Sequence, residues 1–491
     1  MVFNSLEYAI FLPIVLGLYW LLSHRKQNLL LLAASYVFYG AWDVRFLGLM
    51  IISTLTDFTV GRLLERTEDD RRRKRIFMIS LVVNLGILGF FKYANFFTAS
   101  AARLLKGFGL QPHLPVLHIL LPIGISFYTF HGISYTFDVY RRQIRATDNL
   151  LNFACFVSFF PQLVAGPIGR AHIQLPQFEN PRKKPPPEDV RSALFLILLG
   201  LFKKVAIADG LAPFVASSFG AASHAGWPSL LVGMYAFAFQ IYGDFSGYSD
   251  IARGSARLFG IELIKNFDQP YLSRNITEFW RTWHISLSSW LRDYLYVPVG
   301  GNRGSSLATY RNIMITMLLG GLWHGARWTF VVWGGLHGAY LVGHRLFMGR
   351  RARARADEQP IGRPLGPRGR VREEGPPRLH WSDIVPAVLT FHLVCLAWIF
   401  FRAQTFGEAF HYIGGIVTLR SGGHLDPNAV WTLAFAAIAI IGIDLVQRQA
   451  NSETPVLGWH PIARGLVYGS LLIPVILFTG GVAVPFIYFQ F

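Results

Sequence analysis

The chain is dominated by long apolar runs that short polar segments separate. A helix that crosses a bilayer needs about 20 mostly apolar residues. Because several runs are short or contain Gly and Pro, we expect about 11 transmembrane helices together with re-entrant and amphipathic helices. The predicted fold is therefore an all-α, multi-pass membrane protein. The candidate runs are residues 6–22, 28–42, 46–63, 76–97, 114–139, 150–168, 193–217, 228–251, 310–323, 328–347, 384–401, 431–446 and 465–491.

The charge content agrees with a membrane protein. Lys and Arg number 46 and Asp and Glu number 28, which gives a net charge of +18, yet only 15% of residues are charged. A soluble domain carries about 25% charged residues, so the chain lacks the polar surface of several soluble domains. Its two cysteines, Cys155 and Cys395, lie in apolar runs. We therefore expect no disulfide framework, no metal cluster and no nucleic-acid partner.

Clusters of basic residues predict the orientation of the spans, because short loops rich in Lys and Arg stay in the cytoplasm. The clusters are residues 24–26, 71–75, 141–142, 182–184 and 345–378. They place the N-terminus outside the cytoplasm; a role in binding anionic lipid or a partner is the alternative. The last cluster is rich in Arg, Pro and Gly. It predicts a disordered cytoplasmic loop at about 349–380 within one membrane-embedded domain, residues 1–491.

Polar residues inside apolar segments are costly and are therefore functional candidates. The first concentration spans residues 240–250 and contains Asp244, Ser246 and Tyr248. It stands at the predicted end of an apolar helix. One interpretation is the wall of a polar cavity, whose groups need protein or water partners. The alternative is a helix end at the membrane interface.

The second concentration begins at Asn266 and Gln269 and continues into a predicted amphipathic helix over residues 275–294. Asn275 can cap this helix, with Glu278 at the third helical position. Large apolar residues recur every three to four positions, which favours a helix at the bilayer interface. This stripe consists of Ile276, Trp280, Trp283, Leu287, Trp290 and Tyr294.

Three histidines stand out in these segments. His284 borders the apolar stripe, and a hydrogen-bonded structural histidine is the alternative to a functional one. His324 follows Trp323 at the junction of two apolar segments, among glycines that permit close approach. A neutral imidazole in a low-dielectric site can act as a general base. For His324 and His337 the alternative is packing between helices.

Several catalytic motifs are missing from the sequence. It contains no Gly-x-Ser-x-Gly elbow, no Walker A loop and no His-Glu-x-x-His site. The spacing of His324 and His337 does not indicate a shared metal. The sequence therefore points to histidine-centred acid/base chemistry inside a membrane. Candidate catalytic residues are His324 and His284; candidate cavity-lining residues are Asp244, Ser246, Tyr248, Asn266, Gln269, Trp283, Trp323 and His337.

These motifs resemble those of the membrane-bound O-acyltransferases, and within them the branch that O-acetylates bacterial polysaccharides such as alginate. The resemblance covers nearly the whole chain. It is most specific in the combination of residues 279–287 with residues 322–325. Other matching segments are residues 2–5, 35–40, 121–130, 138–141, 160–168 and 244–249.

The resemblance implies a ring of tilted helices around a central tunnel, in the inner membrane of a bacterium. The N-terminus of the protein is then periplasmic. The resemblance also implies that His324 is the family's catalytic histidine. His284 corresponds to a second histidine, which other branches often replace by Asn or Asp. The implied donor is acetyl-CoA or another cytoplasmic acyl thioester, with no bound cofactor. His131 stands where the family pattern has Gln.

The predicted function is a membrane O-acyltransferase that moves an acetyl group across the membrane for O-acetylation of an exopolysaccharide, with His324 as general base. The implied partner, besides the lipid bilayer, is a periplasmic SGNH-type acetyltransferase or another polysaccharide-modifying protein. The alternatives are a polysaccharide exporter and an assembly scaffold without catalysis.

Overall fold

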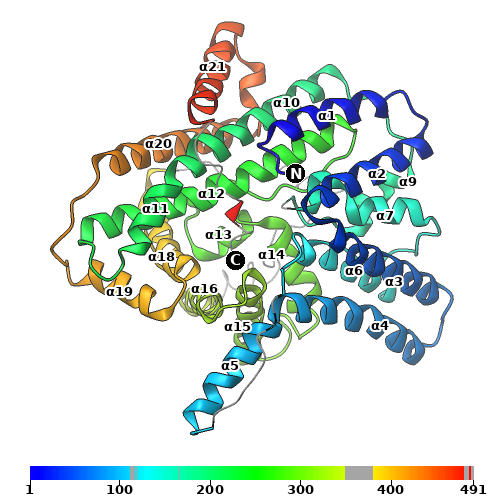
Figure 1. The fold of residues 1–491 in the computed structure, drawn as a ribbon, viewed down its shortest axis with the longest axis horizontal. Coiled ribbons are helices and arrows are strands. Elements are labelled where there is room, and N and C mark those ends of the chain that lie inside the picture. Colours follow the sequence, from blue (N-terminus) through cyan, green and yellow to red (C-terminus); the bar gives the residue numbers. More distant parts are fainter. Residues whose placement is uncertain (111–116, 118, 165, 349–379, 480–485, 488–491) are drawn as a thin grey trace. The chain divides into compact units, whose positions relative to one another are not determined.

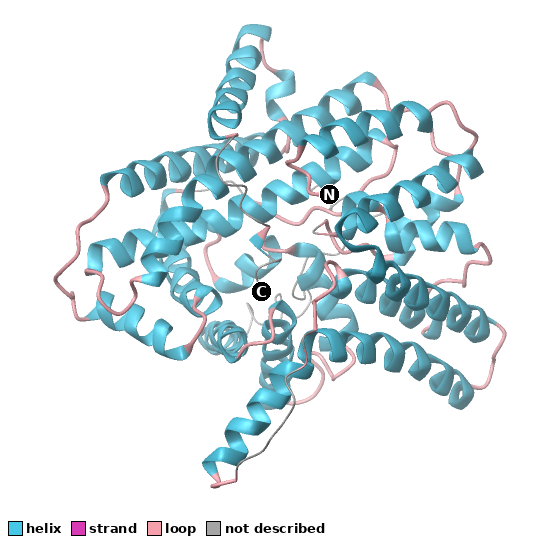
Figure 2. Ribbon diagram, in the orientation of Figure 1, coloured by secondary structure: helices cyan, strands magenta, loops and turns pink. Residues whose placement is uncertain are grey.

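A computed structural model describes the chain except for residues 111–116, 118, 165, 349–379, 480–485 and 488–491. Its described elements are all helices, joined by loops (Figures 1 and 2). They form two compact units. Unit 1 comprises Met1–Pro185 and Ala256–Leu263, and unit 2 comprises Pro186–Ser255 and Ile264–Phe491. The organisation of residues 1–491 as a single domain stays a prediction.

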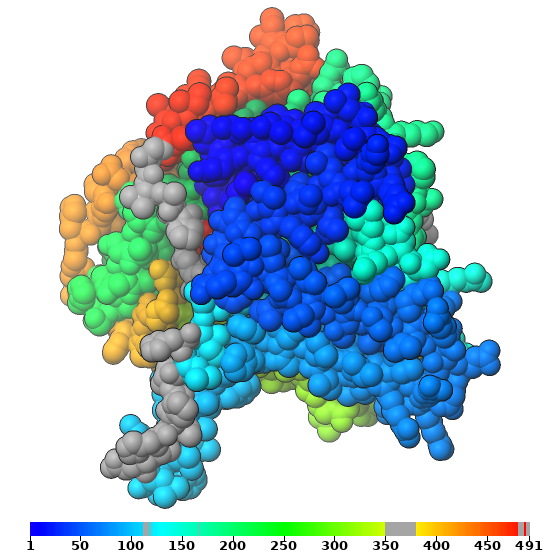
Figure 3. All heavy atoms as spheres, turned by 45° about the vertical axis from the view of Figure 1, so that its right-hand side comes forward, coloured from blue at the N-terminus to red at the C-terminus, as the bar shows by residue number. Residues whose placement is uncertain are grey.

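Unit 1 is built from short and medium helices that pack largely in chain order. The first helices form one continuous surface, seen in the blue atoms of Figure 3. The α-helices are α1 (Leu6–Tyr19), α2 (His24–Asp43), α3 (Leu47–Glu65), α4 (Asp70–Leu88), α5 (Ala94–Gly107), α6 (Ile125–Tyr140), α7 (Leu150–Ser158), α8 (Phe160–Leu163) and α9 (Ala171–Glu179). The shorter turns are η1 (Val44–Phe46) and η2 (Gly89–Tyr93).

A buried carboxylate joins three helices of unit 1. Asp57 of α3 accepts hydrogen bonds from Ser80 Oγ (2.6 Å) and Asn84 Nδ2 (2.8 Å) of α4. Ser80 in turn lies 2.9 Å from the Thr136 hydroxyl of α6. Because an unpaired buried carboxylate is very costly, these neutral partners hold α3, α4 and α6 in one arrangement.

His131, the departure from the family pattern, has a structural contact in unit 1. It is fully buried in α6, and its Nε2 accepts a hydrogen bond of 2.9 Å from the Gly169 amide. The imidazole thus ties α6 to the segment that precedes α9.

Unit 2 contains the longest helices and all of the candidate site residues. Its α-helices are α10 (Pro187–Leu201), α11 (Gly210–Gly220), α12 (Trp227–Leu258, whose last turn belongs to unit 1), α13 (Ile276–Thr282), α14 (Ile285–Leu291), α15 (Ser306–His324), α16 (Trp328–Phe347), α18 (Ile384–Arg402), α19 (Phe406–Val417), α20 (Pro427–Ala450) and α21 (Pro461–Phe478). The shorter elements are η3 (Phe202–Asp209), η4 (Pro270–Leu272), η5 (Arg292–Tyr296), η7 (Trp381–Asp383) and η8 (Pro455–Gly458).

The predicted helix end near Asp250 is wrong. Helix α12 continues to Leu258, because the two carboxylates of this stretch have cationic partners on η3. Lys204 Nζ lies 2.7 Å from Asp244 Oδ1, and Lys203 Nζ lies 2.8 Å from Asp250 Oδ2. η3 is a π-helical segment, a distortion that often occurs at functional sites.

The predicted helix over residues 275–294 is also wrong in part. Its start is confirmed, since Asn275 Oδ1 accepts a hydrogen bond of 2.9 Å from the Glu278 amide. The helix breaks, however, between Thr282 and Ile285, where His284 has a left-handed φ of 43°. Two short helices, α13 and α14, replace the single predicted one.

Five helical segments of the described chain are long and apolar enough to cross a membrane: His24–Glu65, Asp70–Gly107, Trp381–Arg402, Pro427–Ala450 and Pro461–Phe478. The total of about 11 spans and the central tunnel stay predictions.

The basic clusters at residues 24–26 and 71–75 were expected in loops, but they form the first turns of α2 and α4. Here the helix begins before the apolar run does. The loop predicted at about 349–380 falls almost entirely on residues that the structure does not describe.

Candidate active site

The site is built on the tightly packed hairpin of α15 and α16. A Cβ added at Gly321 would lie 2.2 Å from the Phe330 carbonyl oxygen, and one at Gly334 would lie 2.2 Å from that of Met317. At Gly325, an added Cβ would lie 2.2 Å from the Phe330 ring. Glycine at these positions lets the two helices approach closely and fixes the turn that follows His324.

His324 is the last residue of α15 and is buried among aromatic rings. Its ring centroid lies 5.0 Å from that of Trp333, 5.3 Å from that of Phe401 and 5.0 Å from that of its neighbour Trp323. The partial negative charge at a helix C-terminus stabilises a cation there. The position therefore suits an imidazole that takes up a proton during a reaction.

His284 is held in place by its backbone as much as by its side chain. The two residues after His284 are hydrogen-bonded to Asn266. The Ile285 amide donates to the Asn266 carbonyl oxygen (2.9 Å), and the Ser286 amide donates to Asn266 Oδ1 (3.3 Å). The Asp268 amide donates to the Thr282 carbonyl oxygen (2.9 Å). This short pairing stabilises the left-handed conformation of His284, which is otherwise uncommon outside glycine.

The two histidines lie side by side. Their ring centroids are 6.3 Å apart, and Trp323 lies 6.0 Å from His284 on one side of the pair. Phe245 of α12 covers His284 edge-on at 4.5 Å. Burial lowers the pKa of His284 to about 3, so its imidazole stays neutral at physiological pH. Two imidazoles at this separation can both reach one small polar group, because each hydrogen bond spans about 3 Å.

His337 lies one ring away from this pair. Trp333 contacts both His324 and His337, with 4.8 Å between the Trp333 and His337 centroids. Phe279 stacks on His337 at 6.0 Å and 8°, and Trp280 meets it edge-on at 5.1 Å. Within the described chain neither ring nitrogen of His337 has a hydrogen-bond partner. The structure thus places this third histidine in the same aromatic cluster.

The other sequence candidates fall into two groups. Trp283, the residue before His284, is buried against Phe267 (5.0 Å) and Trp398 (5.1 Å). Gln269 is buried in the segment before α13, with a left-handed φ of 51°.

The second group lies on α12. Asp244 pairs with Lys204 and accepts a hydrogen bond of 2.7 Å from the Ile487 amide. The Tyr248 ring packs against Phe486 in a tilted arrangement, with 4.2 Å between the ring centroids. Ser246, which lies between Asp244 and Tyr248 in the sequence, is also buried. The structure thus gives Asp244 an ion pair, and this helix meets the histidine pair through Phe245.

The comparisons with known proteins agree with one another. A sequence model of the MBOAT, membrane-bound O-acyltransferase family matches residues 129–367. The chain is 41% identical over 466 residues to "Probable alginate O-acetylase AlgI" of Azotobacter vinelandii. This alignment covers 93% of the present chain and 87% of the Azotobacter protein. The chain is 45% identical to the protein of the same name in Pseudomonas aeruginosa (82% of this chain, 72% of the other). It is 35% identical to "Peptidoglycan O-acetyltransferase" of Helicobacter pylori (85% and 80%).

The chain belongs to the membrane-bound O-acyltransferase family. This membership confirms the resemblance found in the sequence and the helical membrane fold. The protein is therefore an O-acyltransferase, an enzyme that transfers an acyl group to a hydroxyl oxygen.

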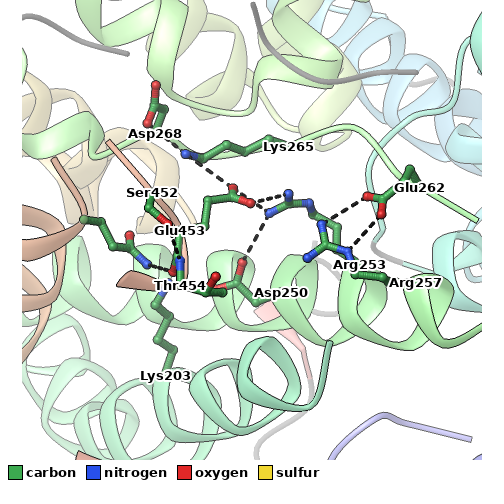
Figure 4. A network of polar contacts seen from close by, with 11 residues as sticks. Lys203, Asp250, Arg253, Arg257, Glu262, Lys265, Asp268, Ser452, Glu453 and Thr454 are labelled. Atoms are coloured by element: carbon green, nitrogen blue, oxygen red, sulfur yellow. Dashed lines mark hydrogen bonds and ion pairs between the residues drawn. The ribbon is translucent and has the colours of Figure 1, made fainter. Parts of the chain in front are cut away.

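A network of ion pairs holds the segment of the acyltransferase that leads into α13 (Figure 4). Arg253 of α12 makes a two-pronged contact with Glu453, at 2.8 Å and 2.7 Å. Lys265 Nζ lies 2.8 Å from Asp268 and 3.4 Å from Glu453. Burial opposes the charge on Lys265, but Asp268 and Glu453 outweigh it and raise the pKa. Glu453 thereby joins the end of α20 to the chain segment that positions His284.

Sequence reasoning missed this network and the aromatic enclosure of His324. Glu453 and Arg253 are far apart in sequence, and no local pattern pairs them. The partners of Asp244 and Asp250 could have been suspected from the sequence, because Lys203 and Lys204 interrupt an apolar run. Such a pair inside a membrane segment implies buried carboxylates nearby.

The candidate site is organised around imidazoles and aromatic rings. Among the described residues, no group of three or more His, Cys, Asp or Glu side chains is arranged to hold a metal ion. The chemistry that the described site itself supports is proton transfer and hydrogen bonding by His284 and His324.

Proposed function

We propose that this protein transfers an acetyl group from a cytoplasmic acyl thioester to O-acetylate an exopolysaccharide of the alginate type. The observation that carries the proposal is the His284–His324 pair, 6.3 Å apart inside a buried aromatic cluster of an O-acyltransferase. Relatives named for alginate O-acetylation, similar over most of the chain, support the choice of polymer.

His324 acts as the general base in this proposal. It accepts the proton of the acceptor hydroxyl while that oxygen attacks the thioester carbonyl carbon. The carbon–sulfur bond then breaks, and the departing thiolate takes the proton back from the imidazolium. General-base catalysis of this kind contributes typically about 10²–10⁴-fold to the rate.

His284 has the complementary role. Because its imidazole stays neutral, its N–H can donate a hydrogen bond to the thioester carbonyl oxygen as negative charge develops there. Trp323, Trp333 and Phe401 exclude water from the neighbourhood of His324, which strengthens both interactions.

The cellular setting follows from the basic clusters and the proposed chemistry. The protein lies in the bacterial inner membrane with a periplasmic N-terminus, since its basic clusters belong in the cytoplasm. The donor, acetyl-CoA or another acyl thioester, approaches from the cytoplasm. The acceptor is a hydroxyl of a periplasmic SGNH-type acetyltransferase or another polysaccharide-modifying partner. The predicted cavity residues Asp244, Ser246, Tyr248, Asn266, Gln269 and His337 then position the donor or the helices around it.

Reconstitution tests the proposal. Purified protein in proteoliposomes receives acetyl-CoA with a labelled acetyl group on one side, and label on an acceptor protein or on polymer is measured on the other. We expect transfer by the wild type and by the His224→Ala variant, whose histidine is exposed, but not by His324→Ala. Flux of polymer without acetyl transfer, and without dependence on His324, would instead support an exporter. Equal transfer by His324→Ala would contradict the assigned base.

A further inference from the structure

Two neighbouring cavities of unit 2 share one basic side chain. The first, of about 560 Å³, lies among α11, α20 and α21, and its walls include Phe214 and Phe478. Asp209 also lines it, but this carboxylate is paired with Lys204 at 2.7 Å. The second, of about 520 Å³, is lined by Ser223, Gln404 and other polar residues. Ala216 and Arg402 line both cavities. A guanidinium therefore stands where an apolar space meets a polar one.

Arg402 makes no hydrogen bond or ion pair within the described chain; its guanidinium lies over the Phe219 ring, 5.4 Å from the centroid. Glu408 lines the polar cavity, but its Oε2 accepts a hydrogen bond of 2.8 Å from the Gln404 amide. Burial and the like charge of Arg402 lower the pKa of Arg327 to about 10. The negative charge of Glu408 favours the charged form of both guanidiniums, and an anion beside Arg402 would favour it further.

A second unsatisfied group faces the apolar cavity. Gln240 of α12 lines it with only 8% of its surface exposed, and its Oε1 has no hydrogen-bond partner in the described chain. A buried carbonyl oxygen without a donor is costly. An occupant of this cavity should therefore offer an N–H or O–H group to Gln240 as well as an anionic group to Arg402.

The walls decide which kind of anion fits. α20 and α21 are two of the helices that are long and apolar enough to cross a membrane, and their outward faces expose Ile438 and Leu477. A cavity between such helices opens toward acyl chains rather than toward water. A soluble sugar acid has the anion and the hydroxyl, but it lacks the apolar part that these walls would cover.

We propose that Arg402 and Gln240 form a binding site for an anionic phospholipid with a hydroxylated headgroup. The phosphate pairs with the Arg402 guanidinium, and a headgroup hydroxyl donates to Gln240 Oε1. One acyl chain lies along Phe214 and Phe478. The site is separate from the histidine pair, and it does not depend on the proposed polymer.

Thermal unfolding of the purified, full-length protein in detergent tests this site. Phosphatidylglycerol and phosphatidylcholine are added in mixed micelles, and the unfolding temperature is followed by tryptophan fluorescence. We expect phosphatidylglycerol to stabilise the wild type and the Arg103→Gln variant, whose arginine is exposed on α5. Arg402→Gln should bind phosphatidylglycerol about tenfold more weakly, as for loss of a charge-assisted hydrogen bond. Gln240→Leu should show a smaller loss.

Further arms distinguish the source of the anion. Inorganic phosphate and glucuronate, both soluble, should not reproduce the stabilisation by phosphatidylglycerol. Equal stabilisation by either of them, or equal binding of phosphatidylglycerol by the wild type and Arg402→Gln, would overturn the proposal. If Arg402→Gln does not fold, the Arg402→Lys variant is used in its place. In addition, native mass spectrometry of the wild-type protein counts the lipid molecules that it retains. Retention of phosphatidylcholine equal to that of phosphatidylglycerol would also overturn it.

Discussion

The imidazole rings of His284 and His324 lie 6.3 Å apart, centroid to centroid, with an angle of 53° between their planes. One ring stands in a break between two short helices and the other at the end of a long one. Neither position depends on the other locally, so the pair exists only because α15 and the segment from Asn266 to α14 pack together.

The left-handed backbone at His284 predicts which substitutions the fold accepts. Asn adopts this conformation readily, whereas a β-branched residue does not. We expect His284→Asn to fold with near wild-type stability and to transfer acetyl groups more slowly. His284→Val should lose about 1–2 kcal/mol of unfolding free energy. Unfolding temperatures in detergent separate the two variants, and equal values for both would show that the backbone imposes no such restriction.

The buried imidazole of His284 also predicts a dependence of stability on pH. Burial lowers its pKa to about 3, whereas an exposed histidine titrates near about 6.5. Below pH of about 6.5 the unfolded chain binds a proton that the folded chain does not, so this contribution to stability is lost as the pH falls toward 3.

His284→Asn removes this titration. Its unfolding temperature should therefore fall less than that of the wild type between about pH 7.5 and about pH 5. Replacement of the exposed His224 by Asn is the matched control. Parallel curves for the wild type and His284→Asn would contradict the buried, neutral state of this imidazole.

Close packing of α15 and α16 predicts opposite effects for two glycines of the same helix. A Cβ at Gly334 would lie 2.2 Å from the Met317 carbonyl oxygen, whereas Gly343 has no neighbour within 4 Å. Gly334→Ala should lose about 1–3 kcal/mol through overpacking and should lower acyl transfer by displacing His324. Gly343→Ala should be neutral or stabilising, because alanine favours helix. Unfolding temperature and transfer rate are the measurements; similar results for both would rule out the close approach.

The contact of Arg253 with Glu453 predicts that two distant charges stabilise the protein together. A double-mutant cycle with Arg253→Gln and Glu453→Gln should give a coupling of about 1.5–3 kcal/mol, because the pair is two-pronged and partly buried. The pair Arg142–Asp70, in which both side chains are exposed, is the control and should show no measurable coupling. Additive effects of the two substitutions would show that Arg253 and Glu453 do not stabilise the fold through this contact.

The sequence predicted those features that depend on local chemistry. The cap at Asn275 is confirmed by its hydrogen bond with the Glu278 amide. It was predictable because an Asn side-chain oxygen at the start of a helix accepts a hydrogen bond from a free backbone amide of the first turn. The histidine candidates were recognisable because polar residues inside apolar segments are rare.

Features that depend on distant partners were not predictable. The break at His284 lies within an apolar pattern of helical spacing that continues through it. No local residue indicates that Asn266 accepts hydrogen bonds from the Ile285 and Ser286 amides. The continuation of α12 through Asp244 and Asp250 likewise depends on Lys203 and Lys204, which another helix supplies. Pairing of Arg253 with Glu453 requires the fold itself.

The role of His324 is tested most directly by the acetyl content of polymer secreted by cells that carry His324→Ala in place of the wild-type protein. We expect a loss of at least about 100-fold, the lower limit for a general base, with a normal amount of protein in the membrane. Cells with His224→Ala should secrete fully acetylated polymer. Full acetylation in the His324→Ala cells would contradict the central claim that this imidazole performs the proton transfer.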